Sequence, residues 1–78
     1  MNVTLLAFAQ ARELLGFQER AISVGAEATP ASILQELCPE AKTIIATGRV
    51  AIDLEYGEWS QGLREGQTVA FIPPVSGG

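Results

Sequence analysis

The sequence predicts one α+β domain in which a mixed sheet packs against one main helix. Its 78 residues are enough for a single domain. Several short apolar segments have the length and pattern of strands, whereas a single capped segment has the three- and four-residue spacing of a substantial helix. The segments follow the order strand, strand, helix, strand, short strand, strand.

The first two predicted strands cover residues 2–8 and 17–24. Residues 2–8 are apolar at odd and even positions alike, as in a central strand that is covered on both faces. A short helical turn over residues 10–15 links the two strands and ends at Gly16, the usual residue type just after a helix. We therefore expect the second strand to return beside the first.

The main helix is predicted over residues 28–38. Thr29 occupies a capping position and Pro30 the first helical position. Apolar residues recur on one face of this helix, and they are Ile33, Leu34, Leu37 and Cys38. Pro39 ends the helix or marks its last turn. Cys38 is interpreted as a small buried hydrophobe without a chemical role.

The C-terminal half supplies the remaining strands. Residues 49–56 alternate as a third strand, and residues 68–72 form the last one. Between them a short excursion carries Trp59, which lies either at the edge of the core or at a contact. Residues 42–47 suit either a short strand or a helical extension. The overall order is that of a β-grasp sheet wrapped around one helix, with a domain over residues 1–72.

Composition excludes several classes of function. Five basic against nine acidic residues give a net charge of −4 without a basic stripe, so nucleic-acid binding is not expected. The chain has no histidine and one cysteine, which argues against a metal site and against Cys–His or Ser–His–Asp catalysis. Neither standard glycine-rich phosphate loop occurs. Any reaction here is therefore expected to use another protein's catalytic site.

The same composition bears on partners and location. Hydrophobic residues make up 47% of the chain and charged residues only 18%, which predicts that some apolar surface faces a partner. The single cysteine, together with the lack of a recognisable signal peptide or a membrane-length apolar run, favours a cytoplasmic protein that is not bound to a membrane.

Residues 73–78, Pro-Pro-Val-Ser-Gly-Gly, predict a flexible carrier tail. Two glycines without Cβ atoms can pass through a channel too narrow for other residues. Fully extended, six residues reach about 20 Å, and the two prolines stiffen the base of that arm. The carboxylate of Gly78 can therefore enter the active site of another protein.

Three segments carry a resemblance to a known family. Residues 5–16, Leu-Leu-Ala-Phe-Ala-Gln-Ala-Arg-Glu-Leu-Leu-Gly, are similar to the pattern FFAxxRExxG. Residues 51–56 and 63–78 are similar to AVNxEY and LxDGDEVAxxPPVSGG. These patterns are those of the small subunit of molybdopterin synthase, a sulfur carrier in molybdenum cofactor synthesis. The resemblance spans nearly the whole chain, and its specific part is Pro-Pro-Val-Ser-Gly-Gly.

Two departures from the family pattern lie in the C-terminal half. Asp53 stands where the family usually has Asn, and Glu65 and Gln67 replace the acidic pair of the usual turn. They leave open a divergent paralogue or altered contacts with a partner subunit.

The resemblance implies a ubiquitin-like fold and a defined chemistry for Gly78. An ATP-dependent, E1-like adenylating enzyme joins AMP to its carboxylate, and a persulfide sulfurtransferase then converts it to a thiocarboxylate. The loaded tail enters the large subunit of a heterotetrameric synthase and donates sulfur to cyclic pyranopterin monophosphate, which forms the dithiolene of molybdopterin. No cofactor is bound permanently. Gly77 gives the tail access, and the residues implied to face partners are Phe8, Tyr56, Ile72, Pro73, Pro74, Val75 and Ser76.

Other functions remain open at this stage. Sulfur carriers for thiamine or cysteine synthesis and ubiquitin-like protein modifiers share the fold and the Gly-Gly end, and a β-grasp interaction module without carrier chemistry is a third class. The Pro-Pro-Val-Ser stretch favours the molybdopterin branch. Ordinary core packing is an equal interpretation for Phe8, Tyr56 and Ile72. The sequence does not identify the activating enzyme, the sulfur source or the stoichiometry.

Overall fold

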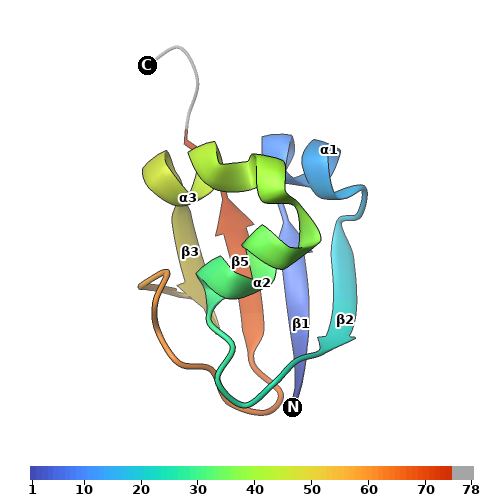
Figure 1. Ribbon diagram of the computed structural model, residues 1–78, viewed down its shortest axis with the longest axis vertical. Coiled ribbons are helices and arrows are strands. Elements are labelled where there is room, and N and C mark those ends of the chain that lie inside the picture. The colour runs from blue at the N-terminus through green and yellow to red at the C-terminus, as the bar shows by residue number, and fades with distance from the viewer. Residues whose placement is uncertain (75–78) are drawn as a thin grey trace.

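A five-stranded mixed sheet forms the body of the protein in the computed structural model, which describes residues 1–74 (Figure 1). The strand order is β2-β1-β5-β3-β4. The neighbouring strands β1 and β5 run parallel, and each other neighbouring pair is antiparallel. The elements are β1 (Asn2–Ala7), α1 (Ala9–Leu15), β2 (Glu19–Ser23), α2 (Pro30–Leu37), the 3₁₀ turn η1 (Pro39–Ala41), α3 (Lys42–Thr47), β3 (Arg49–Ile52), β4 (Glu55–Gly57) and β5 (Thr68–Ile72).

Local sequence signals account for the helix ends. Ser32 N donates to Thr29 Oγ1 at 3.1 Å, and Thr29 N donates to Ser32 Oγ at 2.9 Å, so the two residues cap α2 reciprocally. Helix α1 ends at Gly16, whose φ of 82° lies in the left-handed region that glycine adopts without strain. Both predicted helix ends are confirmed. The segment that suited either a strand or a helix is helical and forms α3.

The core lies between the sheet and the helices, which cover one face of it (Figure 1). From β5, Phe71 and Val69 are fully buried in this layer, and from α2 Leu34 joins them. The ring of Trp59 stacks on that of Phe71 with centroids 6.1 Å apart and planes 2° apart. The backbone carbonyl of Trp59 also accepts a hydrogen bond from Ala31 N at 3.0 Å. Trp59 therefore lies at the edge of the core, which is the first of the two interpretations that the sequence left open.

Two expectations about the strands are wrong. Residues 49–56 form a hairpin of β3 and β4, because Asp53 and Leu54 adopt φ values of 51° and 71° and reverse the chain between them. The alternation of Val50, Ile52 and Leu54 continues through this turn, so the pattern hides it. Residues 2–8 are also not covered on both faces, since every helix lies on one side and Phe8 is 47% exposed.

Other expectations hold. Cys38 is a free, buried thiol at the end of α2, which agrees with its interpretation as a small hydrophobe. The mixed sheet with one main helix confirms the predicted α+β architecture. Within residues 1–74, none of the helices has the length and apolar character needed to span a membrane.

Candidate functional site: the open face of the sheet and the base of the tail

The face of the sheet opposite the helices carries an apolar surface that we call the open face. Its floor follows from the strand register, which places Leu6, Ala70, Ala51 and Tyr56 in one row across β1, β5, β3 and β4. Because the two middle residues are alanines, the row is low at its centre and high at both ends. The result is a hollow of about 290 Å³, lined by Leu6, Phe8, Ala51, Leu54, Tyr56, Ala70 and Ile72.

Several large side chains of the open face are exposed to solvent. Leu54 is 94% exposed, Tyr56 71% and Phe8 47%, although apolar side chains of this size are usually buried. Core packing, the equal interpretation for Phe8 and Tyr56 from sequence, is therefore excluded for these two residues. Exposed apolar area gathered in one hollow is typical of a surface that another protein covers.

The base of the tail adjoins this hollow. Strand β5 ends at Ile72, and Pro73 and Pro74 continue past the edge of the sheet. Two further hollows share these three residues. One reaches α1 through Phe8, Ala9, Gln10 and Glu13, and the other reaches the start of β3 through Thr47, Gly48, Arg49 and Tyr56. Phe8 and Tyr56 therefore join the open face to the base of the tail.

Gly48 fixes the position of the tail base. A Cβ on this residue would lie 2.6 Å from Ile44 O and 2.6 Å from Ile72 O, closer than real Cβ atoms approach other atoms. Gly48 N also donates to Ile44 O at 2.6 Å. Only glycine lets the end of α3 lie directly against the carbonyl group from which the tail departs.

Arg49 supplies positive charge at the same place. The register sets Arg49 opposite Ile72, and its guanidinium carbon lies 5.7 Å from the centre of the Tyr56 ring. The apolar hollow therefore has a cationic rim on the side where the tail begins. Such a rim suits a partner surface that is apolar at its centre and acidic at its edge.

The structure brings together five of the residues expected to face partners: Phe8, Tyr56, Ile72, Pro73 and Pro74. The other two residues of that expectation, Val75 and Ser76, lie outside the described residues, and so do Gly77 and Gly78, to which the carrier chemistry was assigned.

Sequence reasoning missed the rest of the surface, namely Leu6, Gly48, Arg49, Ala51, Leu54 and Ala70. Arg49 and Ala51 are two residues apart in the predicted third strand, and this spacing alone indicates that their side chains lie on the same face. The neighbourhood of Leu6 and Ala70 depends on the parallel pairing of β1 with β5, which no local pattern reveals.

The described part of the chain holds no group of three or more His, Cys, Asp or Glu side chains that are close enough to bind a metal ion. The hollows are lined mainly by apolar side chains and present no cluster of acid, base and nucleophile. What this arrangement can do chemically is hold a partner against the sheet beside the point where the tail begins.

Comparisons with known proteins agree with this geometry. A family model described as the ThiS family matches residues 5–78. A molybdopterin synthase sulfur carrier subunit from Chlamydomonas reinhardtii is 31% identical over 83 residues, and the alignment covers all of both chains. The solution structure of the Haloferax volcanii HVO 2177 protein has a TM-score of 0.81 at 27% identity and covers 100% of this chain and 87% of that one. A complex of subunits 1 and 2 of molybdopterin-converting factor from Helicobacter pylori contains a chain with a TM-score of 0.66 at 22% identity, and all of both chains is covered.

The fold is thus that of a ubiquitin-like β-grasp protein. The chain belongs to the ThiS family, and with it to the ubiquitin-like sulfur carriers that include the small subunit of molybdopterin synthase.

Proposed function

We propose that this chain is the sulfur carrier subunit of a molybdopterin synthase, and that it carries sulfur as a thiocarboxylate on Gly78. The observation that carries the proposal is the 31% identity to a molybdopterin synthase sulfur carrier subunit over the full length of both chains. The Pro-Pro-Val-Ser-Gly-Gly segment supports it, since the ThiS family match extends through Gly78.

The proposed chemistry activates an unreactive carboxylate. A carboxylate is an anion at neutral pH and lacks a good leaving group. Its attack on the α-phosphorus of ATP releases pyrophosphate and leaves an acyl adenylate, in which AMP is a good leaving group. The terminal sulfur of a partner's persulfide then displaces AMP, and a thiol cleaves the resulting S–S bond to release the thiocarboxylate. An adenylating enzyme and a persulfide sulfurtransferase are the partners that these steps require.

The open face and the base of the tail are proposed to dock on the large subunit of the synthase. The Helicobacter pylori complex shows that a chain of this fold assembles with a second subunit. Docking through the hollow would cover Phe8, Leu54 and Tyr56, and the tail would enter the partner from Pro73 and Pro74. The large subunit then supplies the positioning and charge stabilisation that this histidine-free chain lacks.

Intact mass after loading tests the first half of the proposal. Incubation with ATP, a matched adenylating enzyme and a sulfur donor should exchange one oxygen for sulfur, and the change should map to the C-terminal peptide. Sulfur found on Cys38 instead would show that the carrier assignment is wrong. Loaded protein that passes sulfur to a thiamine precursor, and not to cyclic pyranopterin monophosphate, would favour the thiamine alternative.

Two variants separate docking from transfer. Removal of Gly77 and Gly78 should abolish sulfur transfer and leave much of the affinity for the large subunit, because a sheet-face interface of about 800 Å² per partner far exceeds the area of two glycines. Gly77→Val should also block loading or transfer, since a β-branched residue cannot adopt glycine-only backbone angles. Gly25→Val is the matched control, because nothing lies within 4 Å of a Cβ on Gly25.

A further inference from the structure

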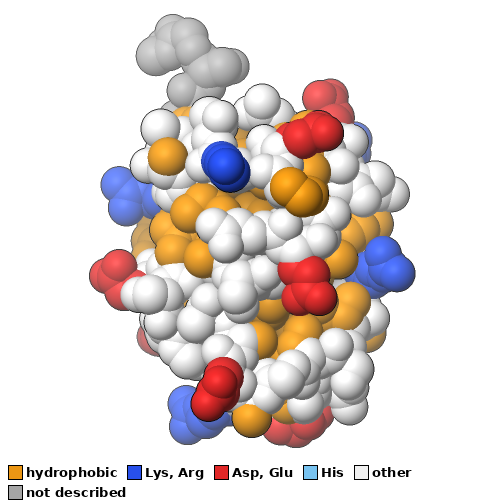
Figure 2. Space-filling model, in the orientation of Figure 1, with side chains coloured by type: hydrophobic (Ala, Val, Ile, Leu, Met, Phe, Trp, Pro, Cys, Tyr) orange, Lys and Arg blue, Asp and Glu red, His pale blue; other side chains and the backbone are white. Residues whose placement is uncertain are grey.

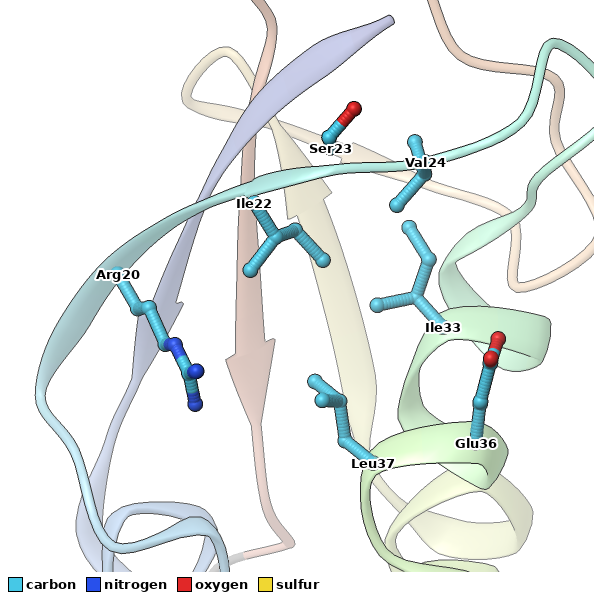
Figure 3. A pocket seen from close by; sticks show the side chains of 7 residues that line it. All are labelled: Arg20, Ile22, Ser23, Val24, Ile33, Glu36 and Leu37. Atoms are coloured by element: carbon cyan, nitrogen blue, oxygen red, sulfur yellow. The ribbon is translucent and has the colours of Figure 1, made fainter.

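A separate groove lies on the helix side of the molecule, between strand β2 and helix α2 (Figure 3). Ile22 of β2 and Val24 just after it point toward Ile33 and Leu37 of α2 across the groove. Ile22 and Val24 are half-buried and Leu37 is 38% exposed, so the centre of the groove is apolar and open to solvent. Arg20, Ser23 and Glu36 complete its lining. Figure 2 shows hydrophobic side chains reaching the surface in the area between these two elements.

The wall formed by β2 is an edge of the sheet with free backbone groups. Val24 N donates to Met1 O at 2.7 Å, and Ala7 N donates to Gln18 O at 2.9 Å, which fixes the alternation of the β1–β2 ladder. Even-numbered residues of β2 therefore direct their N–H and C=O groups toward β1. The backbone groups of Glu19, Ala21 and Ser23 point the other way, where the described chain places no further strand.

The side chains of β2 match this edge. Arg20, Ile22 and Val24 face the groove in one row, about 7 Å apart along the strand. A strand added to β2 would therefore meet a cation at one end of the row and two apolar residues at the other. Opposite charges and apolar pairs are the favourable cross-strand neighbours for such a row.

We propose that this groove binds an extended peptide segment of a partner protein, which adds to β2 as a sixth strand. The segment has an acidic residue opposite Arg20 and apolar residues at the next two alternate positions, where they fill the space between Ile22, Val24 and Leu37. Backbone hydrogen bonds to Glu19, Ala21 and Ser23 hold it, and the apolar residues give it specificity.

Two other occupants fit less well. The groove has a volume of about 230 Å³, below the roughly 300–1,000 Å³ of sites that enclose small molecules. A second copy of the chain, paired antiparallel through β2 in one continuous sheet with all helices on the same side, would set Arg20 opposite Arg20, Ile22 or Val24 of that copy. No such register gives Arg20 an acidic neighbour, whereas a peptide of the proposed composition does.

The groove is separate from the site proposed for sulfur transfer. It shares no residue with the hollow on the open face or with the two hollows at the base of the tail. Strand β1 lies between β2 and β5, from which the tail departs. A peptide can therefore hold the carrier by this edge while the tail and the open face serve another protein.

Amide NMR spectra of the full chain test the proposal. The probe is a blocked peptide with isoleucine at two alternate positions, threonine between them, and glutamate two positions beyond. The order along β2 can run either way, so a peptide of reversed sequence is titrated as well. Saturation should shift the amides of Glu19, Ala21 and Ser23 and slow their hydrogen exchange. The amides of Arg20 and Ile22, which already bond to β1, should exchange as before, and so should those of the open face.

Matched variants make the test specific. Leu37→Asp should weaken binding of the better of the two peptides about tenfold or more, while Leu14→Asp should leave it unchanged, because both leucines are 38% exposed and only Leu37 lines the groove. Ala21→Pro removes one outward N–H and should weaken binding without breaking the β1–β2 ladder. Exchanging glutamate for lysine in the peptide should also reduce affinity.

Three results would overturn the proposal. They are no binding of either peptide at millimolar concentration, shifts that gather on the open face, and edge amides that become protected with rising protein concentration in the absence of peptide. The last result would identify a second copy of the chain as the occupant.

Discussion

Gln67 Nε2 donates a hydrogen bond to Asp53 Oδ2 at 3.3 Å, and this bond joins the β3–β4 turn to the loop before β5. Asp53 Oδ1 also accepts from Thr68 N at 2.9 Å, and Gln67 Oε1 accepts from Arg64 N at 2.8 Å. The two departures from the family pattern are therefore partners. The family pattern has an amide at position 53 and an acid at position 67. This chain has the acid at Asp53 and the amide at Gln67, so hydrogen-bond donor and acceptor are exchanged.

Restoring the family's order at both Asp53 and Gln67 should preserve the contact between them. As a single change, Gln67→Glu would set two carboxylates side by side and should lower the free energy of unfolding by about 1 kcal/mol. Combined with Asp53→Asn, the same change restores one donor and one acceptor. We expect a favourable coupling free energy of about 0.5–1 kcal/mol in a double-mutant cycle measured by urea unfolding.

Asp53→Asn alone is the internal control, because asparagine also tolerates positive φ and keeps an oxygen for Thr68 N. It should change stability by no more than about 0.5 kcal/mol. Additive effects in the double variant would show that Asp53 and Gln67 do not interact in solution.

Gly48→Ala tests the contact that positions the tail base. The added Cβ would meet two backbone carbonyl oxygens, neither of which can rotate away as a side chain can. We expect a loss of about 1–3 kcal/mol in unfolding free energy and weaker sulfur loading, because Ile72 must shift. Gly62→Ala is the control, since nothing lies within 4 Å of a Cβ there. Equal melting temperatures for the two variants would contradict the close approach.

Much of the fold could be predicted from local signals. Thr29 and Pro30 mark the start of α2, and the strand predicted over residues 68–72 coincides with β5. The hairpin at Asp53 and Leu54 could not be found, because an apolar residue occupies a turn position that glycine or asparagine usually fills.

The candidate site was predictable in part. Phe8, Tyr56 and Ile72 were placed near a partner by resemblance alone, and the structure gathers them beside Pro73 and Pro74. The alanine floor of the hollow depends on pairings between strands that are distant in sequence. Local patterns carry no information on such pairings, because each pattern describes a single strand and not its neighbour in the sheet.

Trp59→Ala tests the assignment of Trp59 to the core. The variant loses the stack on Phe71 and leaves a cavity beside the sheet, so its free energy of unfolding should fall by about 3 kcal/mol. Tyr56→Ala removes an aromatic ring that is 71% exposed and should cost about 0.5 kcal/mol, chiefly through its contact with Arg49. Thermal unfolding of both variants makes the comparison. A small effect at Trp59 would mean that its ring does not contribute to the core.

Leu54 combines two unfavourable features that point to docking. It is 94% exposed, and its φ of 71° costs a residue with a Cβ atom about 1–2 kcal/mol. Neither feature benefits the isolated domain. Both are explained if the side chain is held at the tip of the hairpin for burial against the large subunit, beside the hollow that it lines.

Leu54→Gly should therefore move stability and binding in opposite directions. The change creates an Asp-Gly turn, the preferred sequence where both turn residues have positive φ, and it should raise the free energy of unfolding by about 0.5–1 kcal/mol. It should also weaken binding to the large subunit about tenfold, because an apolar side chain of this size contributes about 1.5–3 kcal/mol when buried. Leu37→Ala, in the groove between β2 and α2, should leave the affinity for the large subunit unchanged. Chemical unfolding and calorimetric titration on the same preparations decide the matter: lower stability would show that the turn is not strained, and unchanged affinity would place the hairpin tip outside the interface.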